Sequence, residues 1–184
     1  MVIAFTGHRP HKLWGYVDLR APEQRRENDG QEAAREKYRD LFRVLWSAVL
    51  KEWVNREEEL LLVSGMAIGV DQVAAQVGIQ LRDKRHLNIK VEAAIPCLQQ
   101  DAKWTASSRQ LYNDILRQCD YQTLVYNGSY LSNPRCMQQR NEYMVDKADV
   151  LIAVWDGSNG GTGNCVKYAK KKGVKIIQID PRKI

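Results

Sequence analysis

The sequence predicts an α/β protein with three α/β/α layers and a mainly parallel sheet of about six strands. Two observations carry this prediction. Short β-rich runs alternate with helical patterns from one end of the chain to the other, and the central runs are almost continuously apolar. Strands of that kind are covered by helices on both faces of a parallel sheet. At 184 residues the chain is long enough for a real core, so we expect one Rossmann-like domain over 1–184.

Six apolar runs are the expected strands, and five helical patterns lie between them. The longest helix is expected over 31–55, where apolar side chains recur at helical spacing. The helix near 135–147 has a start signal of its own, with Asn133 as N-cap and Pro134 at the first helical position. The strands are expected at 2–5, 60–63, 89–94, 121–126, 150–155 and 174–179, and the other helices at 67–82, 105–118 and 162–172.

This alternation places every strand-to-helix loop at one edge of the sheet, because crossovers between parallel strands are right-handed. Doubly wound folds bind their ligands at that edge. The polar segment 14–30 is the one long irregular connection. A loop of that length is usually functional or mobile, so it is either a lid over the cleft or an insertion.

The net charge of +6 has two interpretations: attraction to a polyanion such as nucleic acid, or solubility combined with a site for a phosphorylated small molecule. The densest basic clusters, 82–90 and 167–175, fall late in expected helices or just after them. Cations there complement the helix dipole, which favours a solvated face.

Other compositional features point to a cytoplasmic protein. The apolar runs are too short to cross a bilayer, and the N-terminus shows no signal pattern, so we expect no membrane contact. The cysteines lack the spacing of a metal site or a disulfide framework, which favours reduced thiols. We therefore predict no metal and no cofactor beyond a bound nucleotide or phosphate. The four cysteines are Cys97, Cys119, Cys136 and Cys165.

The first candidate loop directly follows the strand at 2–5. Its glycine lets backbone amides approach a ligand, and its Thr, His and Arg side chains can contact phosphate or ribose oxygens. The same residues can also form a plain turn whose His and Arg bind carbonyls or acids. The candidates are Thr6, Gly7, His8 and Arg9.

The second candidate loop runs from the strand at 60–63 into a helix. Its small residues expose the amides of a helix N-terminus, which is a ready anion site. Its glycine spacing is not the dinucleotide fingerprint, and it lacks the lysine of a P-loop. Asp71 either caps its own helix or faces the cleft as a polar ligand or base. The candidates are Ser64, Gly65, Met66, Ala67, Gly69 and Asp71.

The third candidate loop, 156–164, has four glycines among nine residues. Each glycine costs backbone entropy on folding, so this composition favours a backbone cradle for phosphate over a flexible turn. Ser158, Thr162 and Asn164 would add side-chain donors. The candidates are Asp156, Gly157, Ser158, Gly160, Gly161, Thr162 and Asn164.

Further candidates flank these loops. Arg135 and Arg140 do not share one helical face, so we expect one to bind phosphate and the other to pair with an acid. Asn141 can contact a ribose or base. Trp155 either stacks on a base or, as we favour, lies in the core. The loop at 96–104 offers two residues to a base pocket, Gln99 and Trp104.

Four motifs follow one another along nearly the whole chain. They are Thr6-Gly7-His8-Arg9-Pro10 with Lys12-Leu13, Gly65-Met66-Ala67 with Gly69-Val70-Asp71, Arg140-Asn141 with Met144-Val145-Asp146, and Trp155-Asp156-Gly157 with Gly160-Gly161-Thr162. Together they resemble the SLOG superfamily, which groups the Smf/DprA DNA-uptake proteins with the LOG phosphoribohydrolases, and within it the YpsA/YoqJ-type branch of bacteria and phages. The resemblance implies a Rossmann-like fold that binds nucleotide-derived ligands at these loops, and a homodimer.

One position departs from the LOG pattern. LOG enzymes carry a Pro-Gly-Gly-x-Gly-Thr loop followed three residues later by a glutamate that takes part in N-glycosidic hydrolysis. Here the loop has no leading proline, and the third residue after Thr162 is Cys165. Whether the chain is an enzyme is therefore open. Asp71 and Asp156 are the carboxylates available to replace that glutamate.

Three functions are compatible with these observations. The leading hypothesis is a binding module that senses or sequesters a nucleotide or a nucleotide-derived ligand of the ADP-ribose or NAD type. The second is an N-glycosidic hydrolase of nucleotides. Single-stranded nucleic-acid binding ranks third, because the chain lacks a stripe of basic and aromatic residues.

Overall fold

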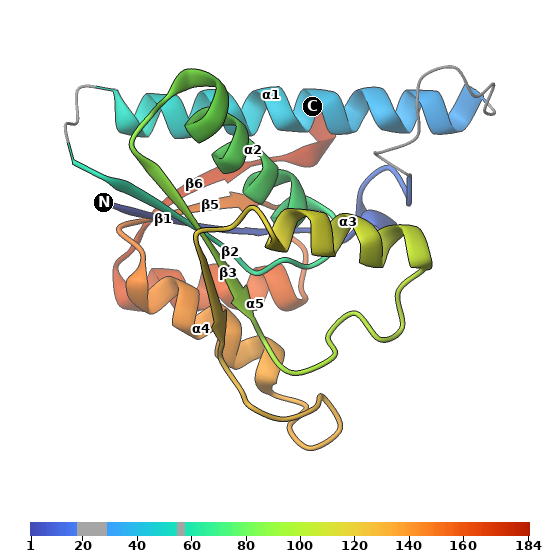
Figure 1. Ribbon diagram of the computed structural model, residues 1–184. Helices are drawn as coiled ribbons and strands as arrows, with labels where there is room; N and C mark the ends of the chain where they lie inside the picture. The colour runs from blue at the N-terminus through green and yellow to red at the C-terminus, as the bar shows by residue number, and fades with distance from the viewer. Residues whose placement is uncertain (18–28, 55–57) are drawn as a thin grey trace.

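Six parallel strands form one sheet in the order β4-β3-β2-β1-β5-β6, with helices between them (Figure 1). The computed structural model describes residues 1–17, 29–54 and 58–184. The strands are β1 (Val2–Gly7), β2 (Leu60–Ser64), β3 (Ile89–Ile95), β4 (Tyr121–Leu124), β5 (Val150–Val154) and β6 (Lys175–Ile179). The helices are α1 (Asp29–Trp53), α2 (Val70–Arg85), α3 (Ala106–Leu116), α4 (Cys136–Lys147) and α5 (Gly161–Lys172), with short 3₁₀ turns at Pro10–Lys12 and Pro181–Lys183.

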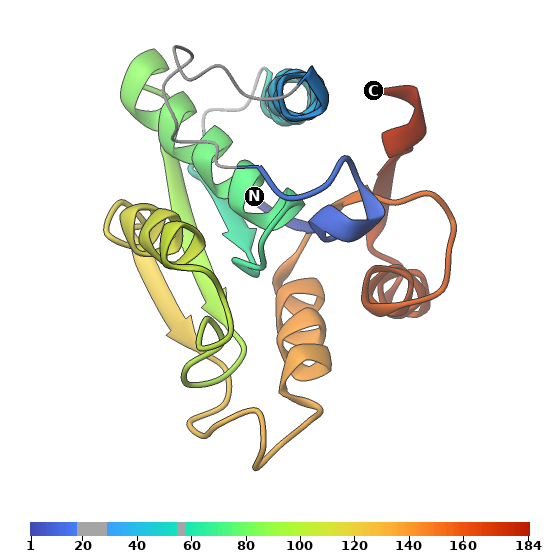
Figure 2. The same cartoon turned by 90° about the vertical axis from the view of Figure 1, so that its right-hand side faces the viewer.

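The helices lie on the two faces of the sheet, with α1, α2 and α3 on one side and α4 and α5 on the other (Figures 1 and 2). Two separate cores result, because successive strand side chains point to opposite faces. In β1, Phe5 packs in the core beneath α1 and α2, and its neighbour Ala4 packs in the core beneath α4 and α5. This arrangement confirms the predicted three-layer fold with a parallel sheet.

Element boundaries differ from the predictions where the backbone turns. The helix expected from residue 67 begins at Val70, because Met66 and Gly69 have positive φ angles of 59° and 107°. The prediction of Asn133 as N-cap was wrong: α4 begins at Cys136 with Arg135 in the N-cap position. The Asn133 carboxamide oxygen instead accepts a hydrogen bond from the Arg135 backbone N–H at 3.1 Å.

Two further expectations concern the periphery of the fold. Most of the segment 14–30, with its suggested lid, lies outside the described residues. In the part of the chain that is described, no helix combines the length and apolar character needed to cross a membrane.

The strand order reverses beside β1. From β1 the chain adds β2, β3 and β4 on one side, and then β5 and β6 on the other. The pairing of β1 with β5 runs from Ile3 with Val150 to Gly7 with Val154, so both strands end at the same level. The loops that follow them therefore diverge at a topological switch point, where open α/β sheets bind ligands.

Candidate functional site

A cleft of about 260 Å³ lies at this switch point, beyond the carboxyl ends of β1 and β5. Residues from all three candidate loops and from α4 line it. Except for His11, Lys12 and Met137, every lining residue belongs to the predicted site. The lining consists of Thr6, Gly7, His8, Arg9, His11, Lys12, Ala67, Asp71, Met137, Arg140, Asn141, Gly160, Gly161 and Thr162.

Two helices begin at the cleft, α2 at Val70 and α5 at Gly161. The first amides of a helix have no partner within it and carry a partial positive charge. Close packing brings the α2 N-terminus to the end of β1: a Cβ atom added to Gly7 would lie 2.4 Å from the Cβ of Val70. Glycine at position 7 is thus required by the approach of the helix, and the two N-termini share one anion-favouring cleft.

A buried ion pair forms one wall. Arg140 and Asp71 are only 6% and 5% exposed, and the Arg140 Nη1 atom lies 3.5 Å from the Asp71 Oδ2 atom. Nη1 also donates to the Gly65 carbonyl oxygen. A Cβ atom at Gly65 would lie 1.7 Å from Nη1, so only glycine leaves room for the guanidinium. Arg140 is therefore the predicted arginine that pairs with an acid, while Arg135 is exposed and does not line the cleft.

The Asp71 carboxylate holds the loop after β2. Its Oδ2 atom accepts a hydrogen bond from the Ala67 N–H at 3.3 Å. Burial raises the pKa of Asp71, although Arg140 and the Ala67 N–H partly oppose the shift. Ser64 supports the same loop: its hydroxyl donates to the Asp71 carbonyl at 2.6 Å and accepts from the Met66 N–H at 3.2 Å. Ser64, Gly65 and Met66 thus lie behind the cleft and position its wall.

Asp156 fixes the glycine-rich loop after β5 and does not line the cleft. Its Oδ1 atom accepts from the Ser158 N–H at 2.9 Å and lies 2.7 Å from His8 Nε2. The Ser158 hydrogen bonds and His8 hold the pKa of Asp156 well below its usual range. Trp155 ties the loop to the protein, because its Nε1 donates to the Ser158 carbonyl at 2.7 Å.

The start of α5 joins the first and third loops. The Thr162 hydroxyl donates to the Gly7 carbonyl at 3.0 Å, and the Asn141 carboxamide donates to the Gly161 carbonyl at 3.4 Å. Asn164 is exposed on the first turn of α5, and Asn164, Gly157 and Ser158 lie outside the cleft lining.

Cys165 is fully buried in the core beneath the loop, and burial raises the pKa of its thiol to about 11.

Lys12 belongs to the first motif but was not among the predicted site residues, and it is a further functional candidate. The 3₁₀ turn at Pro10–Lys12 folds it back over the glycine-rich loop, where its ammonium donates to the Ser158 hydroxyl at 3.2 Å and the Asn159 carbonyl at 3.1 Å. No sequence pattern predicts this reversal. With Arg9 it adds positive charge to a cleft that already contains two helix N-termini.

Among the described residues, no group of three or more His, Cys, Asp or Glu side chains is arranged to hold a metal ion.

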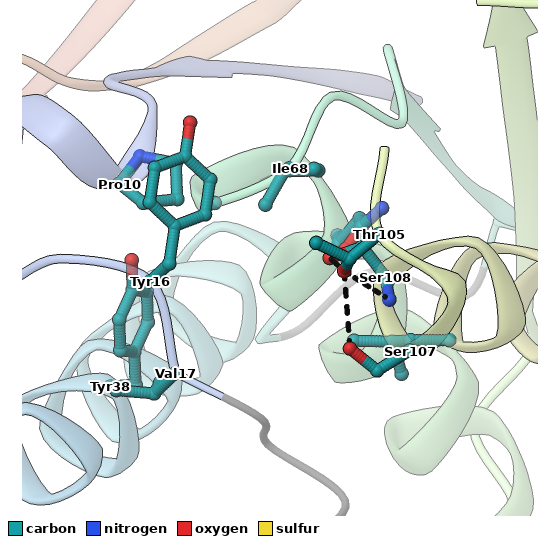
Figure 3. Close-up of a pocket in the computed structure, with 11 residues that line it drawn as sticks. Pro10, Tyr16, Val17, Tyr38, Ile68, Thr105, Ser107 and Ser108 are labelled. Atoms are coloured by element: carbon teal, nitrogen blue, oxygen red, sulfur yellow. Dashed lines mark hydrogen bonds between the residues drawn. The ribbon is translucent and has the colours of Figure 1, made fainter. Parts of the chain in front are cut away.

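A second hollow adjoins the cleft between the loop after β1, the start of α2 and the start of α3 (Figure 3). We call it the side chamber. It consists of two adjoining hollows that share Tyr16, Ile68, Thr105 and Ser108. We call the one of about 220 Å³, drawn in Figure 3, the inner part and the other, of about 390 Å³, the outer part. Of the predicted base-pocket residues, Trp104 lines the outer part, whereas Gln99 is exposed and lines neither. Gly69 lines the inner part.

A family model matches residues 33–184, which is most of the chain. The chain belongs to the YspA SLOG family. This membership confirms the resemblance that the loop motifs indicated. This chain is 35% identical over 136 residues to the SPbeta prophage-derived protein YoqJ of Bacillus subtilis. The aligned residues cover 67% of this chain and 77% of YoqJ.

Other relatives are UPF0398 proteins. One from Halalkalibacterium halodurans is 33% identical over 115 residues, or 62% of this chain and 59% of the relative. One from Bacillus thuringiensis is 28% identical over 173 residues, or 94% of this chain and 84% of the relative. The likeness therefore extends over almost the whole chain.

Proposed function

We propose that this YspA SLOG family protein binds a nucleotide or nucleotide-derived ligand, with a phosphate group in the cleft at the ends of β1 and β5. The observation that carries the proposal is the convergence of three loops, two helix N-termini and the cationic side chains of Arg9 and Lys12 on one cleft at the strand-order reversal. Each of these features favours an anion, and their position is the usual ligand site of the fold.

Arg9 is the side chain best suited to grip the phosphate. It lines the cleft, and with the described residues it makes no hydrogen bond or ion pair, unlike the buried Arg140. A guanidinium binds phosphate through two parallel hydrogen bonds. Lys12 adds a point charge to the same cleft, where its present acceptors are one hydroxyl and one carbonyl. A phosphate bound by both Arg9 and Lys12 would give the Lys12 ammonium a charged acceptor in place of these neutral ones.

The test is a thermal-shift screen with mono-, di- and cyclic nucleotides, NAD, ADP-ribose and short single-stranded DNA, followed by titration of each compound that shifts. A ligand at 100 times its Kd stabilises the fold by about 2.7 kcal/mol. We expect Arg9→Ala to weaken binding by about 10- to 150-fold, the value of a hydrogen bond to a charged group. Arg85→Ala is the matched control, because it removes an exposed arginine from the far end of α2.

Two outcomes contradict the proposal. In one, an Arg9→Ala/Thr162→Val double variant binds every compound as the wild type does. In the other, only single-stranded DNA shifts the melting temperature, and the shift vanishes at high salt, which is the behaviour of a nucleic-acid binder.

Hydrolysis of the N-glycosidic bond is a second candidate, and Asp71 is the observation that favours it. Its carboxyl group lines the cleft, and burial raises its pKa, as general acids require. Mass detection of free base with a ribose phosphate tests this activity. We expect Asp71→Asn to abolish turnover while the bound nucleotide still stabilises the fold. Absence of turnover with every nucleotide that binds would exclude hydrolysis.

A further inference from the structure

The side chamber has two kinds of wall. Pro10 and Tyr16 supply apolar surface on one side, the start of α3 supplies hydroxyls on the other, and Ile68 lies between them. In Figure 3 the Tyr16 ring lies beside Pro10, across the hollow from Thr105 and Ser108. A hollow with one flat apolar wall and one hydrogen-bonding wall matches a planar heteroaromatic ring, whose face is apolar and whose edge is polar.

Tyr16 is 61% exposed, although it is a large aromatic side chain. Tyr38, which lies behind it in the same chamber, is by contrast buried and donates its hydroxyl to the Gly15 carbonyl at 3.1 Å. Tyr38 is therefore a structural part of the wall, whereas Tyr16 presents ring surface to the hollow. Aromatic side chains in this situation act as stacking platforms for nucleobases.

The hydroxyls at the start of α3 leave the identity of a base open. The Thr105 hydroxyl oxygen caps the helix by accepting from the Ser108 N–H at 3.2 Å, and it lies 3.1 Å from the Ser107 hydroxyl. Hydroxyl groups both donate and accept. They can therefore contact the edges of different bases, or a ribose, without selecting one pattern.

The side chamber adjoins the phosphate cleft at Arg9. Arg9 lines the cleft and the outer part of the chamber, and Gly69 and Pro10 line the inner part beside it. The cleft alone, at about 260 Å³, is smaller than the roughly 300–1,000 Å³ of typical small-molecule sites. It has the size of a subsite for one part of a ligand, and the chamber offers the adjoining volume.

We propose that the side chamber is the base subsite, with the nucleobase stacked on Tyr16 and its edge on the α3 hydroxyls while the phosphate occupies the cleft. This inference rests on the proposed function and narrows it. The ligand is then a nucleotide whose base contributes to affinity, rather than a sugar phosphate or an inorganic anion.

The experiment compares two probes and two tyrosine variants. The probes are inorganic pyrophosphate, which has no base, and the tightest binder among ADP, GDP, CDP and UDP. Tyr16→Ala removes the stacking ring, and Tyr130→Ala removes a comparably exposed ring from a loop outside both hollows. We expect Tyr16→Ala to weaken nucleotide binding by about five- to 150-fold, the range of base–aromatic stacking, and to change pyrophosphate binding less than twofold. Tyr130→Ala should change neither.

The outcomes separate this inference from the proposed function. If nucleoside diphosphates bind no tighter than pyrophosphate, or if Tyr16→Ala leaves their affinity unchanged, the base subsite is wrong and the phosphate cleft stands. If neither probe binds, the same comparison is made with the nucleotide that the thermal-shift screen identifies; if that screen identifies none, the proposed function fails, and the base subsite fails with it. Tryptophan fluorescence gives an independent readout, because a base in the chamber should quench Trp104 and the quench should be lost in Trp104→Phe.

Discussion

Replacing Arg140 by leucine tests the buried ion pair that forms the cleft wall. The Arg140 Nη1 and Asp71 Oδ2 atoms are 3.5 Å apart and both side chains are more than nine-tenths buried. At an effective dielectric constant of about 20, Coulomb's law gives an attraction of about 5 kcal/mol at this distance. Removing one partner of a buried pair costs about 3–5 kcal/mol, because the other charge stays buried without compensation. We expect Arg140→Leu to lower the free energy of unfolding at pH 7 by about 3–5 kcal/mol.

The loss should depend on pH in a defined direction. The folded-state pKa of Asp71 lies above its ordinary value of 3.8, so between the two the folded protein binds more protons than the unfolded chain. The free energy of unfolding therefore falls as pH rises through this window. Arg140 partly opposes the raised pKa. Removing Arg140 therefore raises the folded-state pKa of Asp71 further and widens the pH range in which the folded protein binds the extra proton. The difference in the free energy of unfolding between variant and wild type should shrink as the pH is lowered towards about 4.

Urea denaturation at several pH values measures both effects. Lys172→Ala is the surface control: Lys172 pairs with Asp146 at 2.7 Å, but both side chains are nearly half exposed, so we expect a change within about 0.5 kcal/mol. The double variant Asp71→Asn/Arg140→Leu should lose less than the sum of the single variants. A loss below about 1 kcal/mol for Arg140→Leu, or one that is the same at every pH, would refute this account of the wall.

Three more substitutions probe the loops. Gly69→Ala should cost about 1–3 kcal/mol in urea denaturation, because φ is +107° and the new Cβ would lie 2.8 Å from the His8 carbonyl; an unchanged midpoint would contradict this. Trp155→Phe removes the hydrogen bond to the Ser158 carbonyl and should cost about 0.5–1.5 kcal/mol and weaken pyrophosphate binding in titration. Cys165→Glu should lower the free energy of unfolding by about 4 kcal/mol or more without creating hydrolase activity, because the position is fully buried. A variant as stable as the wild type would contradict this expectation.

The fold and the loops of the site could be predicted because they depend on local patterns. Apolar runs alternating with helical periodicity imply parallel strands, and parallel strands all end at one edge of their sheet. Glycine clusters at 65–69 and 157–163 therefore had to meet near that edge. The strand order was not predictable from these patterns, since the pairing of β1 with β5 joins segments that are far apart in sequence.

Side-chain partners were harder to predict than loops. The spacing of Arg135 and Arg140 indicated that only one would bind an acid, but the choice depends on space beside Gly65, which belongs to another strand end. Lys12 reaches the cleft only because of a 3₁₀ turn whose sequence has no distinctive signal. Asn133 was misassigned for a related reason, because its side chain caps a turn that precedes α4 instead of the helix itself.

The choice between binding and hydrolysis depends on Asp71. Asp156 is held away from the cleft by Ser158 and His8, and its lowered pKa keeps it ionised, so it is a poor proton donor. At the position where LOG enzymes carry a glutamate, the buried Cys165 thiol supplies no carboxylate. Among the described residues, Asp71 is the remaining carboxyl group that lines the cleft, and its contact with Arg140 and the Ala67 N–H makes it part of the wall as well. If Asp71→Asn removes turnover but leaves ligand affinity intact, its role is chemical; if it lowers stability alone and the wild type shows no turnover, the cleft is a binding site.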